Sequence, residues 1–195
     1  MGTRDVVGGI DFSGESFVIK SGLVGVDYAI KSGTGERLLT AERKFFADSM
    51  TYVYKDDADE VRFRYGPAED SQPGQAFDLI DATAETPLVT LSRADRESSR
   101  EWVLDAGSGN GAVHIASKSS RIPLLASQPG ENMEVTDAGG EDLGSVSRRI
   151  LAVHFTFDVE LPGVDGVPKA ATLLAVPMLY DLMQERSVPW ELGRD

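Results

Sequence analysis

KAATLLAVPMLYDLMQER, residues Lys169 to Arg186, is the stretch that decides the fold. It is rich in Ala, Leu and Met and lacks the alternation of a strand, so we expect one long helix. Pro177 either kinks this helix or begins its second half. The apolar residues cover nearly the whole circumference, which indicates burial on all sides. They are Ala170, Ala171, Leu173, Leu174, Val176, Met178, Leu179, Leu182 and Met183.

Three locations suit such a helix: the inside of a closed sheet, a membrane, or a binding partner. Its continuous apolar stretch is about 11 residues long, whereas a bilayer requires ~20. We therefore expect the helix to lie inside the protein.

The chain before the helix repeats one short pattern: an alternating apolar strand, an acidic or Gly-rich turn, and a second strand that often ends in Arg or Lys. Each copy predicts a β-hairpin. The clearest copies are YAIKSGTGERLLTAERK (Tyr28 to Lys44), FDLIDATAETPLVTLSR (Phe77 to Arg93), WVLDAGSGNGAVHIASK (Trp102 to Lys118) and MEVTDAGGEDLGSVSRR (Met133 to Arg149). TYVYKDDADEVRFRY, from Thr51, is a further hairpin of this kind.

The longest predicted strand is ILAVHFTFDVEL, residues Ile150 to Leu161, because apolar and other residues alternate over its whole length. In total we count about a dozen strands at intervals of roughly 8–12 residues, a spacing typical of an all-β sandwich or barrel.

These hairpins and the hydrophobic C-terminal helix give the sequence a resemblance to the LURF-one-related family, relatives of the phospholipid scramblases and of the tubby C-terminal domain. The most similar segments are Phe17 to Phe46 and Phe155 to Gln184. The resemblance implies a mainly β fold, a closed antiparallel β-barrel of about twelve strands around the helix. It predicts a flexible tail over residues 1–14, one tubby-like barrel over 15–186 with its central helix near 169–186, and a C-terminal tail over 187–195.

The resemblance implies a non-enzymatic role, as a module that interacts with lipid, membrane or protein. Tubby-like domains bind phosphoinositide head groups through surface Lys and Arg, and scramblases are associated with calcium and palmitoylated cysteines. This chain has no Cys, and its sequence shows no dense cationic cluster. We therefore assign no catalytic, cofactor-binding or metal-binding residue and no cofactor. A membrane lipid or a protein is the expected partner, and the oligomeric state stays open.

The charge balance sets further expectations. The 195 residues include 32 acidic and 19 basic ones, for a formal charge of -13, which repels nucleic acid. Such acidity is typical of a halophilic protein, whose self-repulsion is screened by concentrated salt, and the alternative is an ordinary acidic protein. The sequence shows neither a signal peptide nor a spanning helix, so we expect a cytoplasmic protein, peripheral to the membrane.

One motif favours a different function. VLDAGSGNGAVHIA, from Val103, has the glycines of an S-adenosylmethionine-dependent methyltransferase, with Asp105 to Gly111 as the cofactor loop. That fold needs a helix after the loop and further βα units, whereas the next residues alternate as a strand. We therefore favour a hairpin and keep the methyltransferase as an alternative. A barrel left open for an apolar ligand, with the helix docked elsewhere, is a second alternative.

The remaining candidate sites each have a structural explanation that we prefer. DDADE, residues 56–60, has spaced carboxylates but lacks the Gly and Glu of an EF-hand loop, so we expect a solvated turn, as around Asp137, Glu141 and Asp142. The two histidines, His114 and His154, could hold a metal only if their strands were neighbours. Five aromatic residues could form a ligand surface but are more typical of packing: Trp102, Trp190, Tyr52, Tyr54 and Tyr65.

Overall fold

Strands make up most of the structure. The computed structural model describes residues 5–22, 27–46, 49–69, 71–72, 74–94, 101–105, 111–118, 132–151 and 154–185. The strands are β1 (Val6–Val7), β2 (Ile10–Asp11), β3 (Ser16–Ser21), β4 (Asp27–Ser32), β5 (Arg37–Phe46), β6 (Ser49–Lys55), β7 (Val61–Pro67), β8 (Ala76–Asp81), β9 (Thr86–Arg93), β10 (Glu101–Asp105), β11 (Val113–Lys118), β12 (Asn132–Asp137), β13 (Asp142–Leu151) and β14 (His154–Glu160). The helix α1 spans Gly166–Glu185.

Strands β3 to β14 form a closed barrel in which each strand is antiparallel to its neighbours in the chain. The barrel closes where β14 pairs with β3, with Phe17 opposite Val159. Alternate side chains of each strand point inward: Phe17 and Ile19 of β3 are buried, whereas Lys20 is exposed. The predicted fold class, a mainly β closed barrel with a C-terminal helix, is confirmed, as is the pairing of the strands in the quoted hairpins.

Three hairpin turns share one geometry. In residues 32–36, 56–60 and 137–141 the first residue donates its N–H to the carbonyl of the fifth, and the fourth donates to the carbonyl of the first. The fourth residue has a positive φ in each case, and it is Gly35, Asp59 or Gly140. Such a turn with a neighbouring bulge bends a hairpin tightly, which accounts for the repeated pattern in the sequence.

The prediction of one long strand from Ile150 to Leu161 is wrong. It contains the end of β13 and the whole of β14, which pair with each other so that Leu151 lies opposite His154. Only residues 152 and 153, outside the described residues, connect the two strands. The apolar alternation continues through this connection, and no Gly or Pro marks a turn there. The sequence pattern therefore predicts a single strand.

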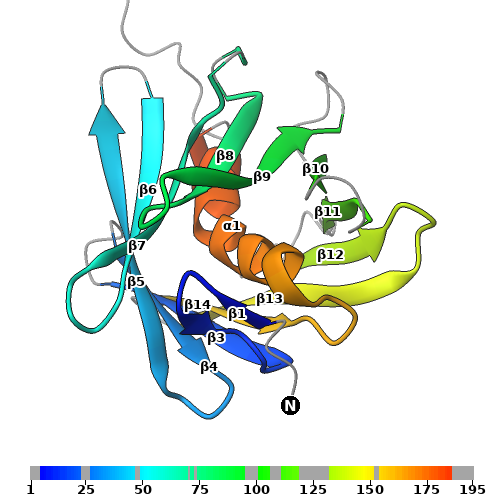
Figure 1. Ribbon diagram of the computed structural model, residues 1–195. Helices are drawn as coiled ribbons and strands as arrows, with labels where there is room; N and C mark the ends of the chain where they lie inside the picture. Colours follow the sequence, from blue (N-terminus) through cyan, green and yellow to red (C-terminus); the bar gives the residue numbers. More distant parts are fainter. Residues whose placement is uncertain are drawn as a thin grey trace, which may run out of the picture.

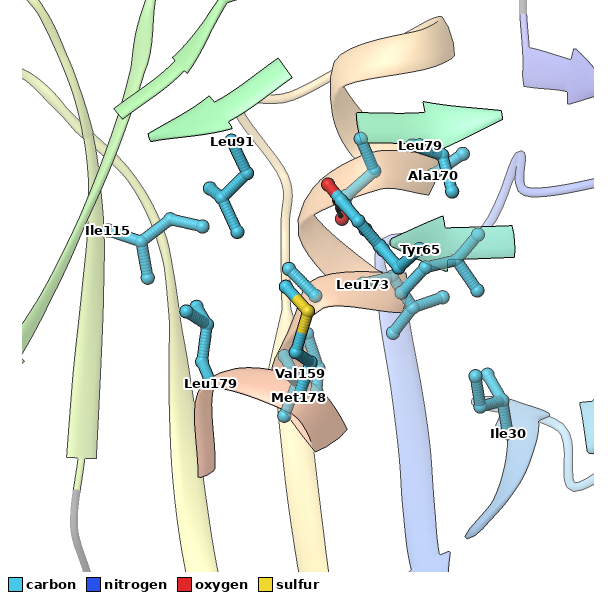
Figure 2. Close-up of a cluster of buried hydrophobic side chains, with 14 of the residues drawn as sticks. Ile30, Tyr65, Leu79, Leu91, Ile115, Val159, Ala170, Leu173, Met178 and Leu179 are labelled. Atoms are coloured by element: carbon cyan, nitrogen blue, oxygen red, sulfur yellow. Dashed lines mark hydrogen bonds between the residues drawn. The ribbon is translucent and has the colours of Figure 1, made fainter. Parts of the chain in front are cut away.

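Helix α1 fills the barrel, as predicted (Figure 1). Every residue from Ala170 to Tyr180 is buried, and Figure 2 shows strand side chains such as Leu91 and Ile115 gathered around the helix. Pro177 lies within the continuous helix, where it leaves the carbonyl of Leu173 without its usual donor. Within the described residues, no helix has the length and hydropathy needed to cross a membrane.

The helix begins at Gly166, three residues before the predicted start, because a distant residue stabilises its first turn. The N–H of Gly166 donates to Oδ1 of Asp5 at 2.8 Å, and Nζ of the buried Lys169 lies 3.9 Å from Oδ2 of Asp5. Asp5 thus caps the helix across 161 positions of sequence. Pro168, in the first turn, is a local start signal, but nothing at residues 166–168 reveals the distant cap.

A two-stranded ribbon, β1 and β2, lies within residues 1–14, where the sequence predicts a tail. Phe12 is completely buried, and its ring centroid lies 6.3 Å from that of Phe63. Gly8 has a positive φ, and a Cβ there would lie 2.6 Å from the ring of Phe63. The ribbon therefore packs onto the core.

Candidate interaction surface

Charge is segregated around the barrel. Strands β3 to β7 carry eight cationic and two acidic residues. Strands β8 to β14 carry four cationic and nine acidic residues. In a chain with a formal charge of -13, the strands on one side of the barrel are thus cationic, while the β4–β5 and β6–β7 turns between them add five acidic residues: Glu36, Asp56, Asp57, Asp59 and Glu60.

Seven of these cations define a surface that we call the cationic face. Its members are Lys20, Lys31, Arg37, Lys44, Lys55, Arg62 and Arg64. They are half-buried or exposed, whereas their inward neighbours, such as Ile19 and Tyr54, are buried. Lys20 and Lys55 share one row of the sheet, through Ala29 and Thr40.

The part of the face nearest the β6–β7 turn is ion-paired. Nζ of Lys55 lies 2.8 Å from Oε1 of Glu42 and 3.1 Å from Oδ1 of Asp59. The guanidinium of Arg62 lies 2.7 Å from Oδ2 of Asp56. These contacts raise the pKa of Lys55, chiefly through the hydrogen bond to Glu42, and the hydrogen bond from Arg62 lowers the pKa of Asp56.

The rest of the cationic face includes cations that are not ion-paired with described residues. Lys20, Lys31 and Arg64 form no ion pair with any described residue, and Lys44 only approaches Glu42, at 3.7 Å. Lysine and arginine side chains presented in this way attract anionic groups, above all a surface that carries many of them.

A buried polar cluster holds the end of the helix. Asp181, 7% exposed, accepts hydrogen bonds from the hydroxyls of Tyr28, at 2.8 Å, and Tyr52, and its Oδ2 lies 3.1 Å from a guanidinium nitrogen of Arg43. Burial, followed by the charge of Asp181, raises the pKa of both phenols. The cluster joins three successive strands to the helix and has a structural role.

A groove lies between the N-terminal ribbon and the β4–β5 and β6–β7 turns. Its charged lining consists of Asp11, Glu15, Glu36, Asp56, Asp57 and Arg37. Arg37 belongs to both surfaces, so this acidic groove borders the cationic face.

The methyltransferase loop does not have the structural context that it requires. Strand β10 ends at Asp105 and pairs with β11 in antiparallel fashion, from Leu104 opposite Val113. Residues 106–110 lie outside the described residues. A cofactor loop of that class joins a strand to a helix, so the hairpin interpretation is confirmed for the strands on both sides.

The other candidate residues lie apart or in the core. His114 is on β11 and His154 begins β14, with two strands between them. Trp102, Tyr52, Tyr54 and Tyr65 point inward and are at most 2% exposed, so their predicted packing role is confirmed. Trp190 lies outside the described residues. Within the described ranges, no three acidic or histidine side chains are placed to hold a metal ion.

The Asp-rich turns are held by their own backbone. Oδ1 of Asp56 accepts the N–H groups of Ala58 and Glu60, and Oδ1 of Asp137 accepts those of Gly139 and Glu141. The first carboxylate of each turn is therefore engaged in forming the turn.

The cationic face was not predicted from the sequence. Its signal is a lysine at an outward position of each of four successive strands: Lys20, Lys31, Lys44 and Lys55. Since these residues are 11 to 13 positions apart in the chain, a search for local runs of Lys and Arg does not find them. Strand register brings them together.

No protein-family model and no curated protein matches the chain. A protein of Arabidopsis thaliana with a known X-ray structure is similar in fold, with a TM-score of 0.54. The similarity covers 93% of this chain and 99% of the plant protein at 14% sequence identity. At this identity it supports the barrel fold alone.

Proposed function

We propose that this chain is a non-enzymatic barrel of the tubby-like, LURF-one-related kind that docks on anionic lipid membranes through its cationic face. The observation that carries the proposal is the segregation of charge around the barrel. Three cations of the face, Lys20, Lys31 and Arg64, have no carboxylate partner among the described residues and are available to lipid phosphates.

The filled interior supports a role at the surface. Residues such as Leu173, Leu174 and Met178 occupy the space that an apolar ligand would need in a barrel of this size. The helix lies inside, so the alternative of an open barrel would require it to leave. The outer surface is the better candidate for recognition.

Electrostatic attraction to a membrane is compatible with the negative net charge. Twelve strands about 4.8 Å apart give the barrel a diameter of roughly 18 Å, and tilt widens it further. The Debye length at physiological ionic strength is about 8 Å. When the cationic face approaches a membrane, the acidic strands on the far side therefore add little repulsion. When the acidic side approaches instead, the membrane repels the protein.

Flotation with vesicles tests the proposal. We expect the protein to float with phosphatidylcholine vesicles that contain phosphatidylserine, but not with phosphatidylcholine alone, and to be released by high KCl. Each cation near an anionic surface contributes about 1 kcal/mol, so the double variant Lys20→Gln, Arg64→Gln should bind at least about tenfold more weakly.

The control variant changes the net charge by the same amount, but on strands outside the cationic face. Ser92→Glu with His114→Glu also lowers the charge by two, at outward positions of β9 and β11. It should bind like the wild type. Failure of the folded wild type to float at any KCl concentration would refute membrane docking and would favour a protein partner.

A further inference from the structure

The β6–β7 turn places its carboxylates against the cationic face. Oδ1 of Asp57 lies 2.6 Å from Nε of Arg37, and Oε2 of Glu60 lies 2.9 Å from a guanidinium nitrogen of Arg62. Asp59, as described above, contacts Lys55. Three cations of the face are thus covered by anions that belong to the chain itself.

The turn geometry does not require the carboxylates of Asp57 and Asp59. The sister turns, residues 32–36 and 137–141, have the same backbone hydrogen bonds with uncharged residues at the second, third and fourth positions, and all three turns have Glu at the fifth. At the fourth position both have Gly, whereas Asp59 adopts a φ of 62° that Gly would adopt more easily. Only the first acidic residue, Asp56, caps the turn.

We propose that the turn 56–60 is an internal competitor for the anionic ligand of the cationic face. Asp57, Asp59 and Glu60 occupy Arg37, Lys55 and Arg62 in the free protein, and a dense anionic surface displaces them. This inference rests on the proposed function, because it describes how binding at the same face is regulated.

The exposure of the pairs allows such an exchange. The side chains of Arg37 and Asp57 are 54% and 65% exposed, so water and salt weaken their attraction and little free energy is lost when they separate. Arg62 and Asp56 are more buried, at 29% and 14%, and stay paired. Binding should therefore begin only above a threshold content of anionic lipid.

The test is a charge-neutralised turn. In the triple variant Asp57→Asn, Asp59→Asn, Glu60→Gln, the cap Asp56 is kept and three carboxylates are removed. The control Glu85→Gln, Glu101→Gln, Glu141→Gln neutralises three exposed carboxylates on strands and turns outside β3 to β7. Thermal melts followed by circular dichroism show that each variant is folded.

Binding is measured against phosphatidylcholine vesicles with increasing fractions of phosphatidylserine. The variant frees Arg37 outright, whereas Lys55 keeps Glu42 and Arg62 keeps Asp56. A freed cation contributes roughly fivefold in affinity, so we expect the turn variant to bind about fivefold more tightly than the control and to need less phosphatidylserine. A turn variant that floats at phosphatidylserine fractions too low for the wild type would equally support the proposal.

Two results would overturn the proposed competition by the turn, and they have different consequences for the proposed function. Equal affinities of the turn variant and the control, with a wild type that binds through Lys20 and Arg64, would eliminate the competitor and leave the proposed function intact. No binding by any folded variant would eliminate both.

Discussion

Replacing Leu174 with Asp is expected to unfold the protein. Leu174 is completely buried in the middle of a helix that the barrel surrounds on all sides. Loss of a buried leucine costs about 2–5 kcal/mol, and an unpaired buried carboxylate costs several more, whereas domains of this kind have only about 5–15 kcal/mol of stability. Thermal unfolding followed by circular dichroism measures the effect, and Leu179→Asp should act in the same way.

Val6→Asp is the matched control. Val6 is 50% exposed, so the same apolar-to-acidic change should lower the melting temperature far less, even though it places a carboxylate opposite Asp11 across the ribbon. A soluble Leu174→Asp protein with an unchanged melt would contradict a central helix.

Alkaline pH is expected to unfold the protein in one steep transition. Tyr28, Tyr52, Tyr54 and Tyr65 are buried, and burial raises the pKa of each phenol above its ordinary value of 10.0. Above pH 10 the unfolded chain loses protons that the folded chain keeps, so the free energy of unfolding falls as the pH rises. Each phenol contributes about 1.4 kcal/mol per pH unit to this slope.

Ultraviolet absorbance of tyrosinate and circular dichroism, recorded together, test this expectation. Both signals should change at one pH above 10. Tyr65→Phe, which loses only a 3.5 Å contact to the carbonyl of Ala171, should make the slope shallower. Gradual formation of tyrosinate near pH 10 in a protein that stays folded would contradict the buried environment.

The parts of the fold that could be predicted from sequence are those that local patterns encode. Alternating apolar residues and turn residues identify a hairpin within about 17 residues, as in Tyr28 to Lys44. The helix was equally visible, because no strand pattern explains the apolar run from Ala170 to Ala175.

The errors and omissions of the sequence-based predictions arose where contacts between residues distant in the chain determine the structure. The β13–β14 turn was missed because Leu151 and His154 continue an apolar alternation on both sides of it. The helix start was placed three residues late because Pro168 was left out of the helix, although Pro is favoured in a first turn, and because the cap, Asp5, comes from the other end of the chain.

The cationic face was missed for the same reason on a larger scale. Lys20 and Arg64 lie on strands separated by three others, and only the pairing of those strands places both on one side of the barrel. Counted along the chain, the charges are those of an acidic protein. The registered sheet has one cationic side and one acidic side.

The most direct test of membrane docking asks which side of the barrel meets the lipid. Because the chain has no Cys, Thr40→Cys within the cationic face and Thr136→Cys on β12 can each carry a single fluorescent label. With phosphatidylserine vesicles that contain lipids spin-labelled at the head group, we predict strong quenching of the label at residue 40 and little at residue 136. Equal quenching at the two positions, or stronger quenching at 136, would contradict docking through the cationic face.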